Sequence, residues 1–320
     1  MGAPLSSAFA NNALSPAAAS SLAGVISGDS VPPTWAVVDA ALVDAAPFYA
    51  LIERNGGSIV HGYAGSDLAA FGDAGVLLVP LVRDRVRMTA QIEKLLQLGN
   101  PTTALSWLST SAEVPALQAL CLYLGMASIN DRKQPIHCRF ADTRVLPELL
   151  KQLDAEQVTR VRTVVEQWAW VDRQGQYARW VPATPLIAPA DSHTHLHLGM
   201  PQFRALRGNA EADGIFTLLW EQTPSLVPAA QMRGDFYFDL VRILKTATQF
   251  NVKDVKSRLQ FAVLSLTSGV DFHTIPTLRT TWEGVGSGEY LLVDKMPLWG
   301  NAIWEQLEYR RPEAERGVLP

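Results

Sequence analysis

The sequence predicts an α/β N-terminal lobe, built on a mixed sheet with flanking helices, followed by a mainly α-helical C-terminal lobe. Short apolar runs at 35–39 and 76–82 alternate with helical patterns up to about residue 153, which is typical of a sheet covered by helices. A stretch with repeated prolines follows at 181–189. Beyond about residue 200, apolar residues recur at helical spacing, which favours a helical lobe.

These changes divide the 320 residues into four parts. We expect a mobile Ala/Ser-rich tail over 1–34, with a short helix at Pro16–Ile26, and an α/β domain over 35–180. A linker is expected over 181–192, and a helical cargo-binding lobe over 193–320. A chain of this length exceeds a typical single domain, so two lobes are the natural expectation.

In the first lobe, buried strands are expected where apolar residues run together without a helical period. The expected strands are 35–39, 58–63, 76–82, 104–108 and 135–140, and the expected helices include 48–53 and 88–98. Thr110 and Glu113 have the spacing of a capping box, which predicts a helix directly after them. Gln174-Gly175 predicts the turn of a hairpin, because glycine supplies the positive φ that such turns need.

In the second lobe, Asp235 and Asn251 are the expected N-caps of two amphipathic helices, the second ending at Gly269. The region from Trp282 to Trp304 is expected to be irregular. Its Gly-x-Gly-x-Gly run at 284–288 has a spacing unlike that of a dinucleotide-binding loop, and we expect a flexible loop there.

Composition restricts the classes of function. The net charge is −4 and no dense Lys/Arg cluster occurs, whereas a nucleic-acid binder needs a basic stripe. The two cysteines, Cys121 and Cys138, are too few for a disulfide framework and have no zinc-motif spacing, which fits a reducing cytoplasm. No apolar run is long enough to cross a bilayer. Charged residues make up 18% of the chain, which fits either an apolar partner surface or a large core under an uncharged polar surface.

One segment could bind a metal ion. On an extended strand, His193, His195 and His197 would share one face, and three imidazoles could hold zinc. The Asp-x-His-x-His core at 191–195 also resembles the first metal motif of amidohydrolases, although too little chain follows for such a barrel. A metal-dependent hydrolase therefore stays an alternative, beside a polar connector.

Two charged residues flank a predicted strand-to-helix turn. Asp142 stands where the following helix needs an N-cap, and Arg139 is the last charged residue of the preceding strand. An Arg139–Asp142 pair would fix this turn with bidentate geometry. Direct contact with a partner is the other interpretation.

Three segments carry a family resemblance: the apolar run at 35–39, the apolar run at 76–82 and the turn that contains Arg139 and Asp142. In this order they resemble the N-terminal domain of type VI secretion effector-adaptor chaperones, the Tap/Tec adaptor family. The resemblance covers about 35–165, with Thr143 standing where the family usually has proline and with a loose match in the central strand at 79–82. The matching positions are Trp35, Val37, Val38 and Asp39 in the opening strand, Leu122 in a later helix, and Arg139, Phe140, Asp142, Arg144, Val145 and Leu146 at the turn.

The resemblance implies a cytoplasmic adaptor that binds a type VI effector and helps load it onto the VgrG spike, without enzymatic activity or a cofactor. The expected partners are the effector protein and VgrG, with no nucleic acid and no membrane. Aromatic residues dominate binding hot spots, so Trp282, Trp299 and Trp304 are candidate contacts, with core packing as the alternative for each. A structural component of the secretion particle is a further alternative function.

Overall fold

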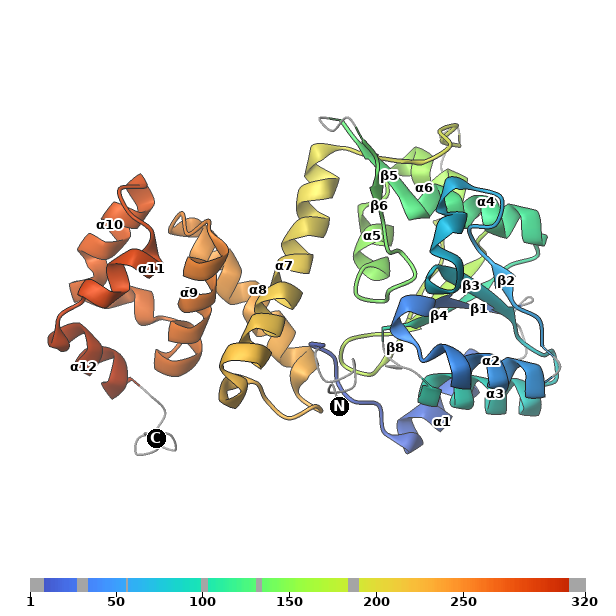
Figure 1. Cartoon of the computed structure of the whole chain (residues 1–320), viewed down its shortest axis with the longest axis horizontal. Helices are drawn as coiled ribbons and strands as arrows, with labels where there is room; N and C mark the ends of the chain where they lie inside the picture. Colours follow the sequence, from blue (N-terminus) through green and yellow to red (C-terminus); the bar gives the residue numbers. More distant parts are fainter. Residues whose placement is uncertain are drawn as a thin grey trace. The chain divides into compact units, whose positions relative to one another are not determined.

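The computed structural model (Figure 1) describes residues 9–27, 34–55, 57–98, 103–130, 134–183 and 190–310. Parts of the expected tail, 1–8 and 28–33, and the segment 184–189 of the expected linker lie outside these residues. The chain forms two compact units, one mainly of residues 11–210 and one mainly of residues 211–320. The division falls inside helix α7 (Met200–Gln222).

A six-stranded sheet organises the first unit, in the order β2-β3-β1-β4-β7-β8. All neighbouring strands in it are antiparallel. A three-stranded sheet, in the order β6-β5-β9, contains one parallel pair, β5 with β9. The strands are β1 (Thr34–Asp39), β2 (Val60–His61), β3 (Val76–Pro80), β4 (Leu105–Ser109), β5 (Met126–Ile129), β6 (Ile136–His137), β7 (Gln167–Val171), β8 (Tyr177–Trp180) and β9 (Leu196–Leu198).

Helices cover both faces of the larger sheet, because its central strands are apolar on both sides. In β1, Val37 joins the core formed with the later helices, while Ala36 and Val38 are buried on the opposite face. The helices are α1 (Pro16–Ile26), α2 (Ala45–Arg54), α3 (Arg85–Leu98), α4 (Val114–Gly125), α5 (Leu146–Gln152) and α6 (Ala155–Arg162). Figure 1 shows α2 and α3 on the side of the sheet opposite to α4 and α6.

Local turn chemistry agrees with the sequence in one place and differs in another. The hairpin of β7 and β8 is present, and Gly175 in its turn has a φ of 79°. The capping box before α4 is wrong: the Thr110 hydroxyl donates to the carbonyl of Val164, and Glu113 is an N-cap without a side-chain bond. A tertiary contact thus takes the hydroxyl that the sequence pattern assigned to the helix.

The second unit is helical and surrounds its own apolar core, which includes Phe216, Leu240, Phe261 and Phe272. Besides the end of α7, it contains α8 (Arg233–Gln249), α9 (Val255–Ser268), α10 (Arg279–Ser287), α11 (Leu292–Lys295) and α12 (Asn301–Tyr309), with short 3₁₀ turns between them. The predicted fold class is therefore confirmed: a sheet with flanking helices, then a largely helical region.

The caps of two helices differ from the prediction. Asp254 caps α9 by accepting from the Ser257 backbone, while Asn251 lies before it with a φ of 60°. Asp235 is inside the first turn of α8, where its carboxylate interacts favourably with the helix dipole but does not cap the helix. Gly269 ends α9 as expected, with a φ of 94°.

The expected flexible loop at 284–288 is wrong, because Gly284 and Gly286 lie inside α10 and Gly288 ends it in the left-handed conformation. Tertiary packing explains the first glycine. A Cβ at Gly284 would lie 2.2 Å from the ring of Tyr290, whose hydroxyl donates to the carbonyl of Thr280. Glycine is a poor helix former, so here close packing outweighs intrinsic propensity.

Arg258 of α9 connects three parts of the helical unit. Its buried guanidinium donates to the carbonyls of Leu244 (3.0 Å) and Val252 (2.7 Å) and to the Thr248 hydroxyl (3.1 Å). It also binds the carboxylate of Glu211 on α7. Its guanidinium thus joins the last turns of α8 to the segment at Val252 and to α7.

In the part of the chain that the structure describes, no helix is both long and apolar enough to span a membrane.

Candidate functional site

The charged residues singled out in the sequence meet where β1 ends. Asp39 is the last residue of β1, opposite Val76 of β3, and its carboxylate is almost fully buried. Arg139 follows β6 and donates to Asp39 Oδ2 from Nε (3.1 Å) and Nη2 (2.8 Å). The pair joins the central strand of the large sheet to the segment after the small sheet.

The predicted Arg139–Asp142 pair is therefore wrong. Asp142 is buried, and its two carboxylate oxygens accept from Arg144 Nε at 3.0 Å. Asp142 is also not the N-cap of α5, which begins at Leu146 after Val145. Instead the carbonyl of Asp142 accepts from the amides of both these residues. Asp142 pairs with Arg144, two residues further along the chain, and Arg139 pairs with Asp39 instead.

Burial dominates the electrostatics of Asp39. Desolvation raises the pKa of this carboxyl, while the charge of Arg139 and its hydrogen bonds oppose the rise. The Arg139 side chain is 40% exposed and the Asp39 side chain 7%, so the arginine is the solvent-facing member of the pair.

Three rings line a cavity beside this pair. His137 stacks on Phe71 with 4.6 Å between ring centroids, and Tyr63 OH lies 3.1 Å from His137 Nε2. Phe71 comes from the 3₁₀ segment η3 (Asp67–Ala74). The cavity measures about 250 Å³, and its lining residues are Asp39, Ala41, Tyr63, Phe71, Ala74, Gly75, Val76, His137, Arg139 and Ala141.

Close backbone packing fixes Tyr63 in this cavity. A Cβ at Gly125, the last residue of α4, would lie 2.7 Å from the tyrosine ring. Burial, the first cause, strongly raises the pKa of Tyr63, so its hydroxyl stays protonated at neutral pH. The ring therefore offers a neutral polar group at a fixed position.

Besides the Asp39–Arg139 pair, His137 and two nearby thiols have pKa values that favour their uncharged forms. Burial lowers the pKa of His137, and the nearby charge of Arg139 lowers it further. Burial raises the pKa of the Cys121 and Cys138 thiols to about 12. A protonated thiol is a poor nucleophile.

The three candidate metal ligands have other partners or positions. His193 contacts the buried carboxylate of Asp191 through Nδ1 (2.5 Å), and His197 Nδ1 lies 3.0 Å from the Ser128 hydroxyl. The His193 and His197 rings stack at 5.7 Å, and His195 precedes β9. Across the described residues, no three His, Cys, Asp or Glu side chains gather as a metal site.

The three candidate tryptophans differ in exposure. Trp282 and Trp299 belong to the core of the helical unit, and Trp299 donates to the Thr281 hydroxyl at 3.1 Å. Trp304 of α12 is 40% exposed and packs against Trp299 at 5.2 Å between ring centroids. Partner contact by these residues stays a prediction, and Trp304 is the one whose ring reaches the surface.

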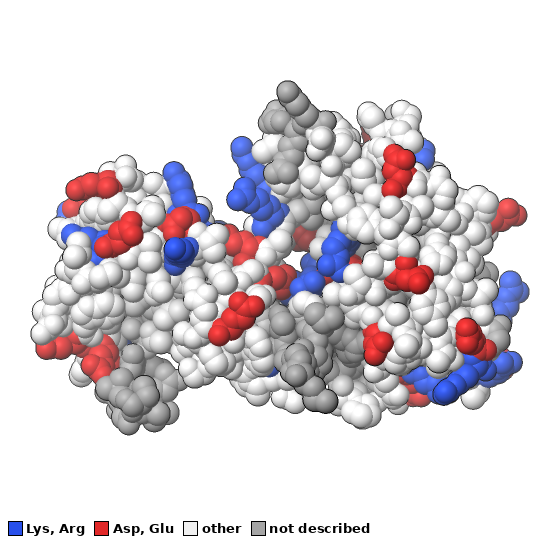
Figure 2. All heavy atoms as spheres, in the orientation of Figure 1, with Lys and Arg blue, Asp and Glu red and all other residues white. Residues whose placement is uncertain are grey.

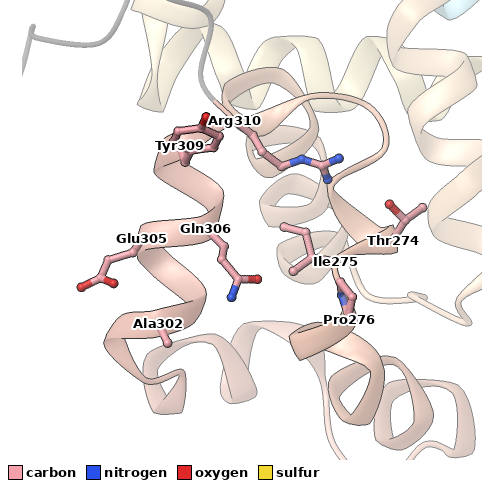
Figure 3. Close-up of a pocket in the computed structure, with 8 residues that line it drawn as sticks. All are labelled: Thr274, Ile275, Pro276, Ala302, Glu305, Gln306, Tyr309 and Arg310. Atoms are coloured by element: carbon pink, nitrogen blue, oxygen red, sulfur yellow. The ribbon is translucent and has the colours of Figure 1, made fainter.

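A groove of about 550 Å³ lies between α12 and the segment 274–276 (Figure 3). Two contacts connect its walls: Thr277 donates to Gln306, and Arg310 binds the Asp271 carboxylate at 2.9 Å. Figure 3 shows Glu305 pointing away from the segment 274–276. On the face drawn in Figure 2, charged side chains are scattered, and wide areas between them carry none.

Sequence reasoning missed the ring cavity beside Asp39. Tyr63, Phe71 and His137 come from three separate segments, and no local pattern connects them. The resemblance marked Asp39 and Arg139, but it did not indicate that they pair with each other.

Residues 34–160 match the model of a family described as a domain of unknown function, DUF4123. This stretch begins with β1 and ends inside α6, so it contains both Asp39 and Arg139. Neither a curated protein nor a solved structure matches the chain.

Proposed function

We propose that this protein is an adaptor chaperone: it binds a type VI secretion effector in the cytoplasm and helps load it onto the VgrG spike, without catalysing a reaction. The observation that carries the proposal is the DUF4123 match, which falls on the same residues as the motifs that resemble effector adaptors. Asp39 and Arg139 are part of that stretch and form an ion pair within it whose carboxylate is buried.

The proposed mechanism is binding of apolar surface. An effector kept for export must stay soluble, and covering its apolar surface contributes roughly 25 cal/mol per Å² before ordering costs. The helical unit supports this role with an exposed ring at Trp304 and a groove beside the same helix. The wide areas without charged side chains on the face drawn in Figure 2 also fit apolar contact.

The experiment is co-purification of the tagged full chain with the effector and VgrG proteins encoded beside its gene. We expect both to be retained, and the effector to lose solubility when the adaptor is omitted. Failure to retain either protein, with the chain folded by circular dichroism, would overturn the proposal.

A matched pair of variants tests the contact surface. Trp304→Ala should weaken effector binding by about thirtyfold, as expected for a tryptophan hot spot of about 2 kcal/mol. Phe238→Ala removes an aromatic ring of similar exposure, 43% against 40%, from α8 and should leave the affinity unchanged. Equal effects of the two substitutions would exclude Trp304 as the specific contact.

A further inference from the structure

The cavity at the end of β1 has the architecture of a binding site. Its floor is buried and contains Tyr63, Gly75 and Val76 together with the Asp39 carboxylate. Its rim is exposed and includes Phe71 and Ala74. Ligand sites combine an apolar concave wall with a few convergent polar groups, which is the combination found here.

The rim presents an arginine with unused donors. Arg139 directs Nε and Nη2 at one oxygen of Asp39, and Nη1 has no partner among the residues described. A guanidinium carries five N–H donors in a planar fork that matches a carboxylate. The exposed side of this fork can therefore receive a second acid.

The acidic side chains at the site are more deeply buried than the basic side chains that they pair with. The side chains of Asp39 and Asp142 are 7% and 2% exposed, whereas those of their partners Arg139 and Arg144 are 40% and 17% exposed. Both negative groups are thus withdrawn from solvent and both positive groups lie outside them. A ligand approaching this site meets positive charge first, which favours an anion.

The volume limits the apolar part of the ligand. About 250 Å³ accommodates one large side chain and excludes a drug-sized molecule, whose pockets run from roughly 300 to 1,000 Å³. The Phe71–His137 stack offers a flat aromatic wall on which another ring can pack.

We propose that this cavity receives one apolar or aromatic side chain of a partner protein while a neighbouring carboxylate of the same segment binds Arg139. The inference rests on the proposed adaptor function for the identity of the partner, but the site itself can be tested without one. It assigns the sheet unit an acidic-apolar docking segment, separate from the contacts made by Trp304.

The test uses phenylacetate as the probe and phenethylamine as the charge-reversed control, both titrated into the full chain and followed by ligand-observed NMR. Phenylacetate should bind saturably in the millimolar range, as its small size allows, and at least about tenfold more tightly than the amine. No saturable binding, or equal binding of acid and amine, would overturn the proposal.

Three variants separate the two parts of the site. Ala74→Leu places a larger side chain on the exposed rim and should abolish phenylacetate binding without disturbing the core. Asp39→Asn frees the guanidinium and should tighten binding by about threefold. The double variant Asp39→Asn/Arg139→Gln keeps a neutral pair in place and should lose the preference for the acid. Unchanged binding in all three, with the fold intact, would show that the probe lies elsewhere.

Two outcomes distinguish the site from the function. If phenylacetate binds as expected but no effector or spike protein co-purifies, the proposed binding site is supported and the proposed adaptor function is overturned. If the complex forms and Ala74→Leu leaves it intact, the adaptor function stands and the docking role of the cavity falls.

Discussion

Replacing Arg258 with methionine should destabilise the helical unit. The substitution keeps an unbranched chain in the core but removes the guanidinium donors to Leu244, Val252 and Thr248. It also leaves the carboxylate of Glu211 without its partner.

The magnitude follows from the groups left unsatisfied. The buried Val252 carbonyl left without a donor costs about 1 kcal/mol, and Glu211 adds about 1 kcal/mol because its side chain is 35% exposed and is partly solvated. The Leu244 carbonyl keeps the Thr248 hydroxyl as a donor, and Thr248 is itself exposed, so neither adds a comparable cost. The expected total is about 2 kcal/mol, which lowers the melting temperature of a unit this size by about 8 °C.

Urea unfolding followed by circular dichroism measures the loss, and hydrogen exchange of peptides from α8 and α9 localises it. Glu211→Gln is the matched control, because it removes the charge and keeps all carbonyl contacts; it should cost about 1 kcal/mol. A loss below about 1 kcal/mol for Arg258→Met would refute the view that this guanidinium holds the ends of α8 and α9 together.

Three further predictions concern the remaining packed sites. Arg139→Gln should lower the free energy of unfolding by about 2 kcal/mol by leaving a buried carboxylate uncompensated, and adding Asp39→Asn should recover most of it; additive losses in urea titrations would argue against coupling. Gly286→Ala should stabilise by about 1 kcal/mol because open space surrounds that helical position, whereas Gly284→Ala should destabilise by a similar amount through its clash; equal melting temperatures would contradict the packing argument. Folding lowers the pKa of His137, so between pH 6.5 and the lower folded-state pKa the unfolded chain binds more protons than the folded chain. The free energy of unfolding should therefore decrease as the pH falls through that range. His137→Asn should flatten that slope in denaturation curves measured at successive pH values, and an unchanged slope would assign it to another group.

The sequence predicted elements where the period of the pattern was strong. The apolar run at 35–39 forms β1, and the helical spacing predicted after Asn251 forms α9, which begins at Val255. Such patterns report on burial of one segment at a time, so they identify strands and helices without fixing their partners. The hairpin turn at Gly175 was predictable for the same reason, since its conformation depends on one residue.

Features that depend on distant contacts were not predictable. The glycines of α10 indicated a loop because helix propensity carries no information about the tyrosine ring packed against Gly284. The exposure of Trp304 likewise depends on which side of α12 faces the core, and Trp299, which precedes that helix, is buried by tertiary packing. At the candidate site, the marked residues were found from motif resemblance, while the aromatic cavity beside them depends on tertiary packing alone.

The pairing of Asp39 with Arg139 has a consequence for synthesis of the chain. The carboxylate leaves the ribosome a hundred residues before the guanidinium that compensates it. Until the guanidinium is available, burial of the Asp39 carboxylate in the central strand carries a desolvation cost that no partner offsets. Early closure of the nascent sheet around this carboxylate is therefore disfavoured. We therefore expect folding of the sheet unit to be completed only when the later segment, which carries Arg139, docks on the sheet. That step would be late and cooperative.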